Sequence, residues 1–174
     1  PATIEAGAFG KAVYSAFLQA AIPEELSKFL LLYLVIWNNR NFDEMFDGIV
    51  YASCIGLGFA ALENILYVAN FGPGVLMGRA ILAIPGHFFF AVAMGFFFSL
   101  AKFAPRYRKL FMCLTLAVPM LLHGCYDGLL MWAENLDKDG FNGWLSIVLS
   151  IVFYAFVIGL WKMGMRRISA FQSR

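Results

Sequence analysis

The chain has 174 residues, of which 61% are hydrophobic and only 14% are charged, and its mean hydropathy is +0.74. Soluble domains carry about 25% charged residues, so this composition excludes a soluble globular domain and predicts an integral protein of the lipid bilayer. The net charge of +2 is too small to indicate a nucleic-acid partner, so none is expected.

Five apolar stretches follow one another along the chain, and we expect five transmembrane helices. Their approximate ranges are residues 9–37, 45–71, 75–103, 110–132 and 141–165. The first is interrupted by Pro23, Glu24 and Glu25, and its uninterrupted part would cover only about 18 Å as a helix. This span therefore includes the residues before Pro23 or enters the membrane as a broken helix. The sequence predicts an all-α, polytopic transmembrane bundle in which residues 1–174 form a single domain.

Basic residues gather in two places and predict the orientation of the bundle. One group lies between the third and fourth spans and the other ends the chain; their members are Lys102, Arg106, Arg108 and Lys109, and Lys162, Arg166, Arg167 and Arg174. Cytoplasmic loops of membrane proteins carry an excess of Lys and Arg, so both groups are expected in the cytoplasm. The C-terminus is then cytoplasmic, and the loop that bears Arg79 faces outward.

The three cysteines all lie within apolar stretches. They are Cys54, Cys113 and Cys125. Unpaired cysteine behaves as a small hydrophobic residue, so we expect all three to be buried in the core.

Seven ionisable side chains lie within the predicted spans, where each charged group costs roughly 2.5 to 3.5 kcal/mol on the insertion scale. They are Glu24, Glu25, Lys28, Glu63, His87, His123 and Asp127, and they include both histidines of the chain. At about 1.5 Å per residue, the carboxyl and imidazole groups of four spans lie about 18 to 26 Å from the inner ends of their helices. Four helices are therefore expected to bring polar groups to one layer, as bundles do at catalytic and cofactor sites.

The excess negative charge of this layer must be neutralised, because it lies in hydrocarbon. Four carboxylates against Lys28 leave three negative charges when both histidines are neutral. Protons shared between carboxylates, a bound cation or water in an internal cavity could supply the offset. Two histidines and a carboxylate are the ligand set of a hydrolytic zinc site, for which His87, His123 and Glu63 are the candidates. Their spacing matches no known zinc signature such as HExxH, so a metal-free site stays open.

Four sequence elements at these residues resemble the PrsW family of intramembrane proteases, distant relatives of the CAAX prenyl endopeptidases and bacteriocin-processing enzymes. The elements are PEELSK at 23–28 (EExxK), FAALEN at 59–64 (FxxxEN), His87, and HGCYD at 123–127 (HxxxD). They occur in order on four successive predicted helices, and the last span has no motif. Members of the family usually carry further helices before the EExxK element, so we expect this chain to be either a fragment or a short member of the family.

The resemblance implies a glutamate- and histidine-dependent peptidase in the plasma membrane of a prokaryote. Its expected substrates are membrane-embedded or juxtamembrane segments of other proteins, typified by a single-span anti-sigma factor. The resemblance does not decide between a metal-dependent mechanism and one in which a glutamate activates water directly.

Peptide hydrolysis needs an activated water, stabilisation of an oxyanion and a proton donor for the leaving amine. We assign water activation to Glu24 or Glu25, because a buried carboxylate is a competent base near neutral pH. Adjacent helical residues point about 100° apart, so only one of the two is expected to face the water. His87 and His123 are expected to bind a metal or, without one, to orient the water and stabilise the oxyanion.

Three further residues are expected to support these groups. Lys28 lies at the i, i+4 position to Glu24 on the same helix face, and the alternative to a catalytic role is that the two form only an intrahelical ion pair, which would not explain Glu25. Asn64 could donate a hydrogen bond to a carbonyl oxygen or hold two helices together. Asp127 is expected to orient His123, or to share a proton with another buried acid.

Two other functions are consistent with part of this pattern. Buried acids and histidines also form proton relays, as in a proton-coupled transporter, although the sequence has no internal repeat. His87 and His123 could alternatively ligate a haem, although four nearby carboxylates disfavour a haem environment.

Overall fold

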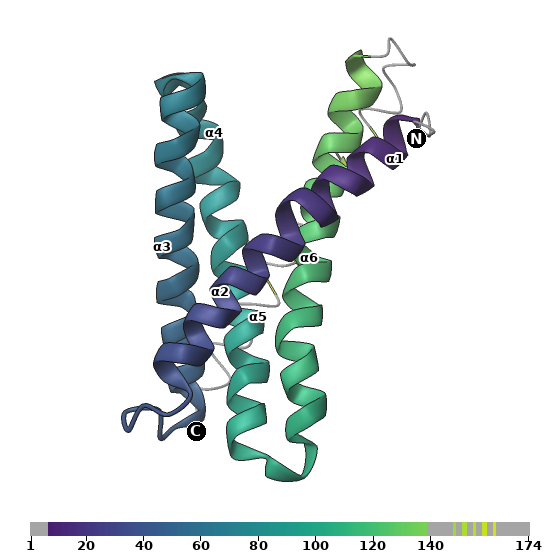
Figure 1. Ribbon diagram of the computed structural model, residues 1–174. Coiled ribbons are helices and arrows are strands. Elements are labelled where there is room, and N and C mark those ends of the chain that lie inside the picture. Colours follow the sequence, from purple (N-terminus) through teal and green to yellow (C-terminus); the bar gives the residue numbers. More distant parts are fainter. Residues whose placement is uncertain are drawn as a thin grey trace, which may run out of the picture.

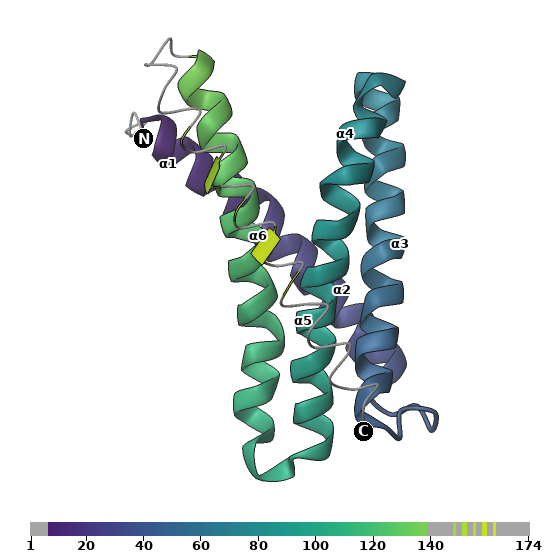
Figure 2. The ribbon, with the colours of Figure 1, turned by 180° about the vertical axis from the view of Figure 1, so that it is seen from behind.

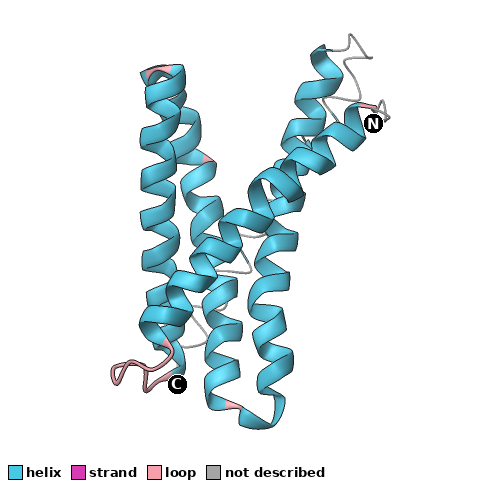
Figure 3. Ribbon diagram, viewed as in Figure 1, coloured by secondary structure: helices cyan, strands magenta, loops and turns pink. Residues whose placement is uncertain are grey.

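The computed structural model describes residues 7–138 and, beyond them, residues 148, 151, 152, 155, 158, 159 and 162. Throughout this part of the chain all regular secondary structure is helical (Figure 3), which confirms the all-α class. The elements are α1 (Ala8–Val13), the π-helix η1 (Tyr14–Ala21), α2 (Ile22–Ile36), α3 (Met45–Phe71), the short 3-10 helix η2 (Pro73–Val75), α4 (Leu76–Ile81), α5 (Ala83–Phe103), the short 3-10 helix η3 (Pro105–Tyr107) and α6 (Arg108–Lys138).

Three helical stretches of the described residues are long and apolar enough to cross a membrane. They are Met45–Phe71, Ala83–Phe103 and Pro105–Ala133. They agree with the second, third and fourth predicted spans. The third predicted span, 75–103, also includes α4, which precedes α5. The predicted fifth span, 141–165, lies outside the described residues apart from isolated positions. That residues 1–174 form a single domain stays a prediction.

The first predicted span changes its hydrogen-bond pattern without a loop. α1, η1 and α2 form one helical segment that crosses the other helices diagonally (Figure 1). At the end of η1 the Ile22 N–H bonds to the Phe17 carbonyl, five residues back. Pro23 has no N–H to donate, and it follows in the first turn of α2, where that group is not needed. Glu24 and Glu25 therefore lie directly after a π-helical stretch, a feature often found at functional sites.

Local signals determine both ends of α3. Glu44 and Asp47 form a capping box, in which each side chain accepts a hydrogen bond from the backbone N–H of the other. The helix ends at Gly72, whose φ of +81° is a conformation that glycine adopts without strain.

α3 and α5 pack closely along their length because small residues face each other. A Cβ atom on Gly56 would lie 2.5 Å from Ala91 Cβ and 3.0 Å from the backbone oxygen of His87. Nearer the inner end, Gly95 lies directly against the backbone of Gly48. Small residues allow such close approach of transmembrane helices. The contact brings His87 against the middle of α3.

α5 packs between α3 and α6, and the two outer arms of the bundle diverge (Figures 1 and 2). One arm is formed by α3 and α4 and the other by α6 and α1. At the closed end, Lys102 Nζ donates to the Trp37 carbonyl at 2.5 Å and so links α5 to the loop before α3. This end carries the basic turn between α5 and α6; its assignment to the cytoplasm stays a prediction.

The main apolar core lies at the closed end, where α2, α3 and α5 meet. It consists of Leu32, Ile36, Phe42, Ala52, Met94 and Phe98. Phe42 and Phe98 stack with their ring centroids 5.4 Å apart. Towards the open end of α3, large apolar side chains such as Leu62 and Phe71 are exposed. The polar layer therefore lies between a packed inner core and diverging outer arms.

The prediction that the cysteines are buried is wrong. Cys54, Cys113 and Cys125 are all exposed on the surface of the bundle. The physical reason is that hydrocarbon solvates an apolar surface, so a small hydrophobic residue in a membrane helix gains little by turning inward.

Candidate active site

Four helices bring their polar side chains into one cluster at the level where α2 crosses α5 and α6. Lys28 of α2 reaches His87 of α5, His87 contacts Glu63 of α3, and His123 of α6 contacts Glu25 of α2. All seven ionisable residues singled out within the predicted spans belong to this network, and Asn64 joins it through Arg79.

Glu25 is the buried centre of the network. Its side chain is 0% exposed, and its Oε1 atom accepts a hydrogen bond from Lys28 Nζ at 2.6 Å. The same oxygen lies 2.9 Å from His123 Nδ1. Lys28 also lies 3.9 Å from Glu24 Oε2 and 4.4 Å from the centroid of the Phe59 ring. The short ion pair of the EExxK element is therefore Glu25–Lys28 at i, i+3, whereas the expected Glu24–Lys28 pair is long.

His87 has a partner at each ring nitrogen. Nδ1 lies 3.0 Å from Lys28 Nζ, and Nε2 lies 2.7 Å from Glu63 Oε2. A charged ammonium group only donates and a carboxylate only accepts. These contacts therefore assign the ring proton to Nε2, which donates to Glu63, and leave Nδ1 to accept from Lys28.

His123 lies between carboxylates. Its Nδ1 faces Glu25, while its Nε2 lies 3.2 Å from Asp127 Oδ2 and 4.0 Å from Glu24 Oε2. The Phe90 ring stacks on the imidazole at 4.9 Å and limits its rotation. Because carboxylates only accept, the ring satisfies Glu25 and Asp127 together when both of its nitrogens carry protons.

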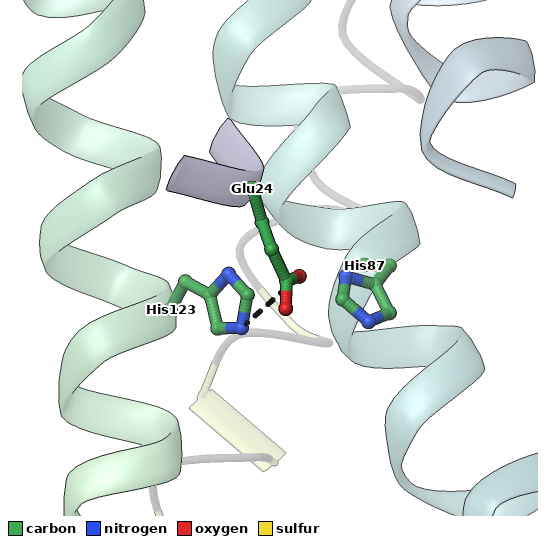
Figure 4. A group of neighbouring side chains, drawn as sticks. All are labelled: Glu24, His87 and His123. Atoms are coloured by element: carbon green, nitrogen blue, oxygen red, sulfur yellow. Dashed lines mark ion pairs between the residues drawn. The ribbon is translucent and has the colours of Figure 1, made fainter. Parts of the chain in front are cut away.

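Glu24 projects between the two imidazole rings, as Figure 4 shows. Its side chain is 20% exposed, in contrast to the fully buried Glu25. The Oε2 atom of Glu24 is buried and has no hydrogen-bond partner among the described residues. An unpaired buried oxygen is costly, so this atom is available to a proton, a water or a cation.

Arg79 is a member of the site that the sequence reasoning placed in an outer loop. The structure places it on α4, with its side chain turned towards α3 and only 16% exposed. Its Nη2 lies 2.7 Å from Glu63 Oε2, and its Nε donates to Asn64 Oδ1 at 2.6 Å. The signal that could have found it is its position eight residues before His87, inside the predicted third span. Eight residues are slightly more than two helical turns, so a continuous helix would place the two side chains about 80° apart, on adjoining parts of its surface.

The second cation changes the charge of the cluster. Four carboxylates now stand against Lys28 and Arg79, which leaves two negative charges when both imidazoles are neutral. A proton on His123 lowers this excess by one, and a divalent cation would remove it. The cluster therefore still favours a further positive charge.

A cavity of about 310 Å³ opens beside the cluster, between α3, α4, α5 and α6. Its polar wall includes Glu63, Arg79, His87, His123 and Asp127. Apolar side chains complete the lining, among them Leu82, Phe90 and Leu130. This volume is at the lower end of the range for ligand sites.

Glu24, His87 and His123 fit a metal ion in type and in position. Each offers one ligand atom, and these atoms lie within 4.8 Å of one another. The unpaired Oε2 atom of Glu24 supports the fit, and Glu25 at His123 Nδ1 is placed as the second carboxylate that usually orients a metal-binding histidine. Ion binding would replace contacts that Lys28 or Glu63 now makes with His87. Glu63 was the predicted third ligand; that choice stays a prediction, while the distances favour Glu24.

Comparison with known proteins identifies clear relatives. Residues 2–160 match the model of a family described as PrsW family intramembrane metalloprotease. The protein named Protease PrsW of Geobacillus kaustophilus is 37% identical over 153 residues, which cover 88% of this chain and 62% of that protein. The Protease PrsW of Bacillus subtilis is 36% identical over 91% of this chain and 67% of its own length.

A more distant relative, the Protease PrsW of Clostridioides difficile, is 32% identical over 95% of this chain. This chain thus spans about three fifths to two thirds of the length of the curated relatives that it matches. No solved structure matches the chain. The matches do not favour a transporter or a haem protein.

Proposed function

The chain belongs to the PrsW family of intramembrane metalloproteases, and from this premise we propose that it is a peptidase that hydrolyses peptide bonds within or next to the membrane. One structural observation supports the proposed peptidase activity most directly. A carboxylate with an unpaired oxygen lies between two imidazoles, beside a cavity and at the depth of the membrane-spanning helices.

Glu24 is the base that activates water. Glu25 is unsuited to this task, because its Oε1 atom already binds Lys28 and His123 and its side chain is fully buried. Both glutamates have an unpaired, buried Oε2 atom, but the Glu24 side chain is partly exposed and projects between the two imidazoles, where a small movement would open it to water. A base must come within hydrogen-bonding distance of the proton that it removes, which favours the partly exposed Glu24 over the fully buried Glu25.

His123 stabilises the developing oxyanion and gives one of its own ring protons to the leaving amine, and the proton that Glu24 takes from the water then replaces it on His123. Its Nε2 lies 4.0 Å from Glu24 Oε2, on the wall of the cavity. Asp127 and Glu25 hold the ring from both sides and keep its N–H groups directed along fixed lines. Donors fixed in advance where charge develops are among the largest contributions to catalysis.

A metal ion, if bound, would be held by Glu24, His87 and His123. Such an ion, for which zinc is the candidate, supplies a Lewis acid that polarises the scissile carbonyl and a site that activates water. Lys28 would then balance Glu25 rather than the metal-binding carboxylate, because its short ion pair is with Glu25.

The proposed substrates are membrane proteins with a segment that can unfold into the cavity. Backbone N–H and C=O groups of an extended peptide are costly in hydrocarbon, and the polar wall of the cavity offers them hydrogen-bond partners. A single-span protein of the anti-sigma-factor type is the substrate class that the family resemblance implies. The setting is the membrane of a bacterium, as for the named relatives.

The test uses the purified chain in liposomes with a labelled single-span substrate. We expect Glu24→Gln and His123→Ala to abolish cleavage without loss of folding. Asp43→Asn, a change of an exposed loop acid remote from the cluster, is the control and should cleave at the wild-type rate. Glu25→Gln should also abolish cleavage, because it frees His123 and Lys28. Normal cleavage by both glutamine variants would refute the mechanism.

A further inference from the structure

Arg79 connects α4 to the cluster through three contacts with α3. Its guanidinium group meets Glu63 and Asn64, and its central carbon lies 3.7 Å from the centroid of the Tyr67 ring. The three partners occupy one face of α3 over slightly more than one turn. A planar guanidinium group can serve all of them at once, which a lysine cannot do.

α4 has little other support on its outer side. It is six residues long, and Met77 and Ile81 are 72% and 62% exposed. The break at Leu82 separates α4 from the regular helix of α5. The polar contacts of Arg79 therefore determine how α4 lies against α3 at the edge of the cavity.

The contact with Glu63 extends to the catalytic cluster. Glu63 Oε2 lies 2.7 Å from both Arg79 Nη2 and His87 Nε2, so one oxygen joins the two side chains. A carboxylate held by arginine keeps a fixed position and accepts the imidazole proton on a fixed line. Because Lys28 approaches the other nitrogen of His87, both the tautomer and the orientation of the ring depend on these two partners.

We propose that Arg79 is a positioning residue of the peptidase, which acts through Glu63 to hold His87 in one tautomer with its proton on Nε2. This inference rests on the proposed function for its effect on catalysis, but the state of the imidazole ring does not depend on any substrate. Arg79 also accounts for the paired Glu63 and Asn64 of the FxxxEN element, since it binds both side chains.

Kinetics provide the first test, with Arg79→Gln, Arg79→Lys and Glu63→Gln in the full chain. We expect Arg79→Gln to lower kcat about 10- to 100-fold with KM unchanged, the usual cost of losing an outer partner of a site residue. Arg79→Lys should recover part of this loss, because it restores the charge beside Glu63 but not the hydrogen bond to Asn64. The double variant with Glu63→Gln should be no slower than Glu63→Gln alone. Arg106→Gln, at the turn between α5 and α6, is the matched control and should have wild-type kinetics.

Nitrogen NMR of the histidine-labelled chain provides the second test, and it needs no substrate. The chain has only two histidines, both in the cluster, so the two rings can be assigned with one histidine variant. We expect His87 to be a single Nε2-protonated tautomer in the wild type and a mixture of tautomers in Arg79→Gln.

Each of three results would overturn the positioning role. The first is a wild-type kcat for Arg79→Gln, and the second is independent effects of Arg79→Gln and Glu63→Gln in the double variant. The third is unchanged ring signals of His87 in Arg79→Gln. If Arg79→Gln does not fold, Arg79→Lys in the same two measurements decides the question. If the wild-type chain cleaves no substrate, the proposed function fails, while the ring signals still test the role of Arg79.

Discussion

Gly56→Ala tests whether the close packing of α3 and α5 maintains the site. The added Cβ would lie 2.5 Å from Ala91 Cβ, whereas carbon atoms pack at about 3.5 to 4.0 Å. The helices must therefore separate by about 1 Å at this level, at a cost of about 1 to 3 kcal/mol for overpacking. The same Cβ would lie 3.0 Å from the His87 carbonyl, so the shift moves the backbone that carries the imidazole. A displacement of 1 Å in a catalytic group can lower the rate about 100-fold.

Gly58→Ala is the matched control, because a Cβ at Gly58 meets no atom within 4 Å. Both variants replace glycine by alanine on the same helix, so the gain in helix propensity is common to the pair. Thermal unfolding in detergent, followed by circular dichroism, and kcat on the same preparations are the assays. We expect Gly58→Ala to match the wild type in kcat and Gly56→Ala to be less stable and slower. Equal stability and equal rates for the two variants would refute the packing argument.

Two further predictions concern charge and metal binding. Lys28→Met should lower the free energy of unfolding by about 3 to 5 kcal/mol, because it leaves the buried Glu25 carboxylate without its cation. In denaturant titrations, the double variant with Glu25→Gln should regain much of this stability. A double variant that is less stable than Lys28→Met alone would contradict the prediction. If Glu24, His87 and His123 hold the metal, elemental analysis should find about one zinc per chain that Glu63→Gln retains and Glu24→Gln loses. Active enzyme without any bound metal would support the metal-free carboxylate mechanism instead.

The helices and the membership of the polar cluster were accessible from the sequence, because both depend on local composition. An apolar run of sufficient length predicts a spanning helix wherever it occurs, and the range 45–71 agrees with the structure at both ends. Charged groups in such runs are costly enough that they need partners, so Glu25, His87 and His123 were recognisable as members of one polar cluster. The same reasoning failed for the cysteines, since an apolar residue in a membrane helix has no strong preference for the inside.

The spacing of residues along the sequence does not predict which members of the cluster contact one another. Glu24 and Glu25 are adjacent, and their different exposure follows from the way α2 crosses α5 and α6. Arg79 was assigned to a loop, because its contacts with Glu63 and Asn64 depend on α4 folding back along α3. Glu63 was grouped with the histidines by its depth, although its contacts are with Arg79 and with one imidazole.

The sequence by itself determined that this chain spans a membrane and that acids, imidazoles and a lysine meet at one depth, because hydrocarbon penalises such groups when they stand alone. Only the tertiary structure decided which oxygen faces which nitrogen, which glutamate is fully buried and where the second cation lies. Helix periodicity sets the direction of a side chain relative to its own axis. The relative positions of those axes depend on tertiary packing. Here they follow from the π-helical stretch before Pro23 and from the glycine contacts between α3 and α5.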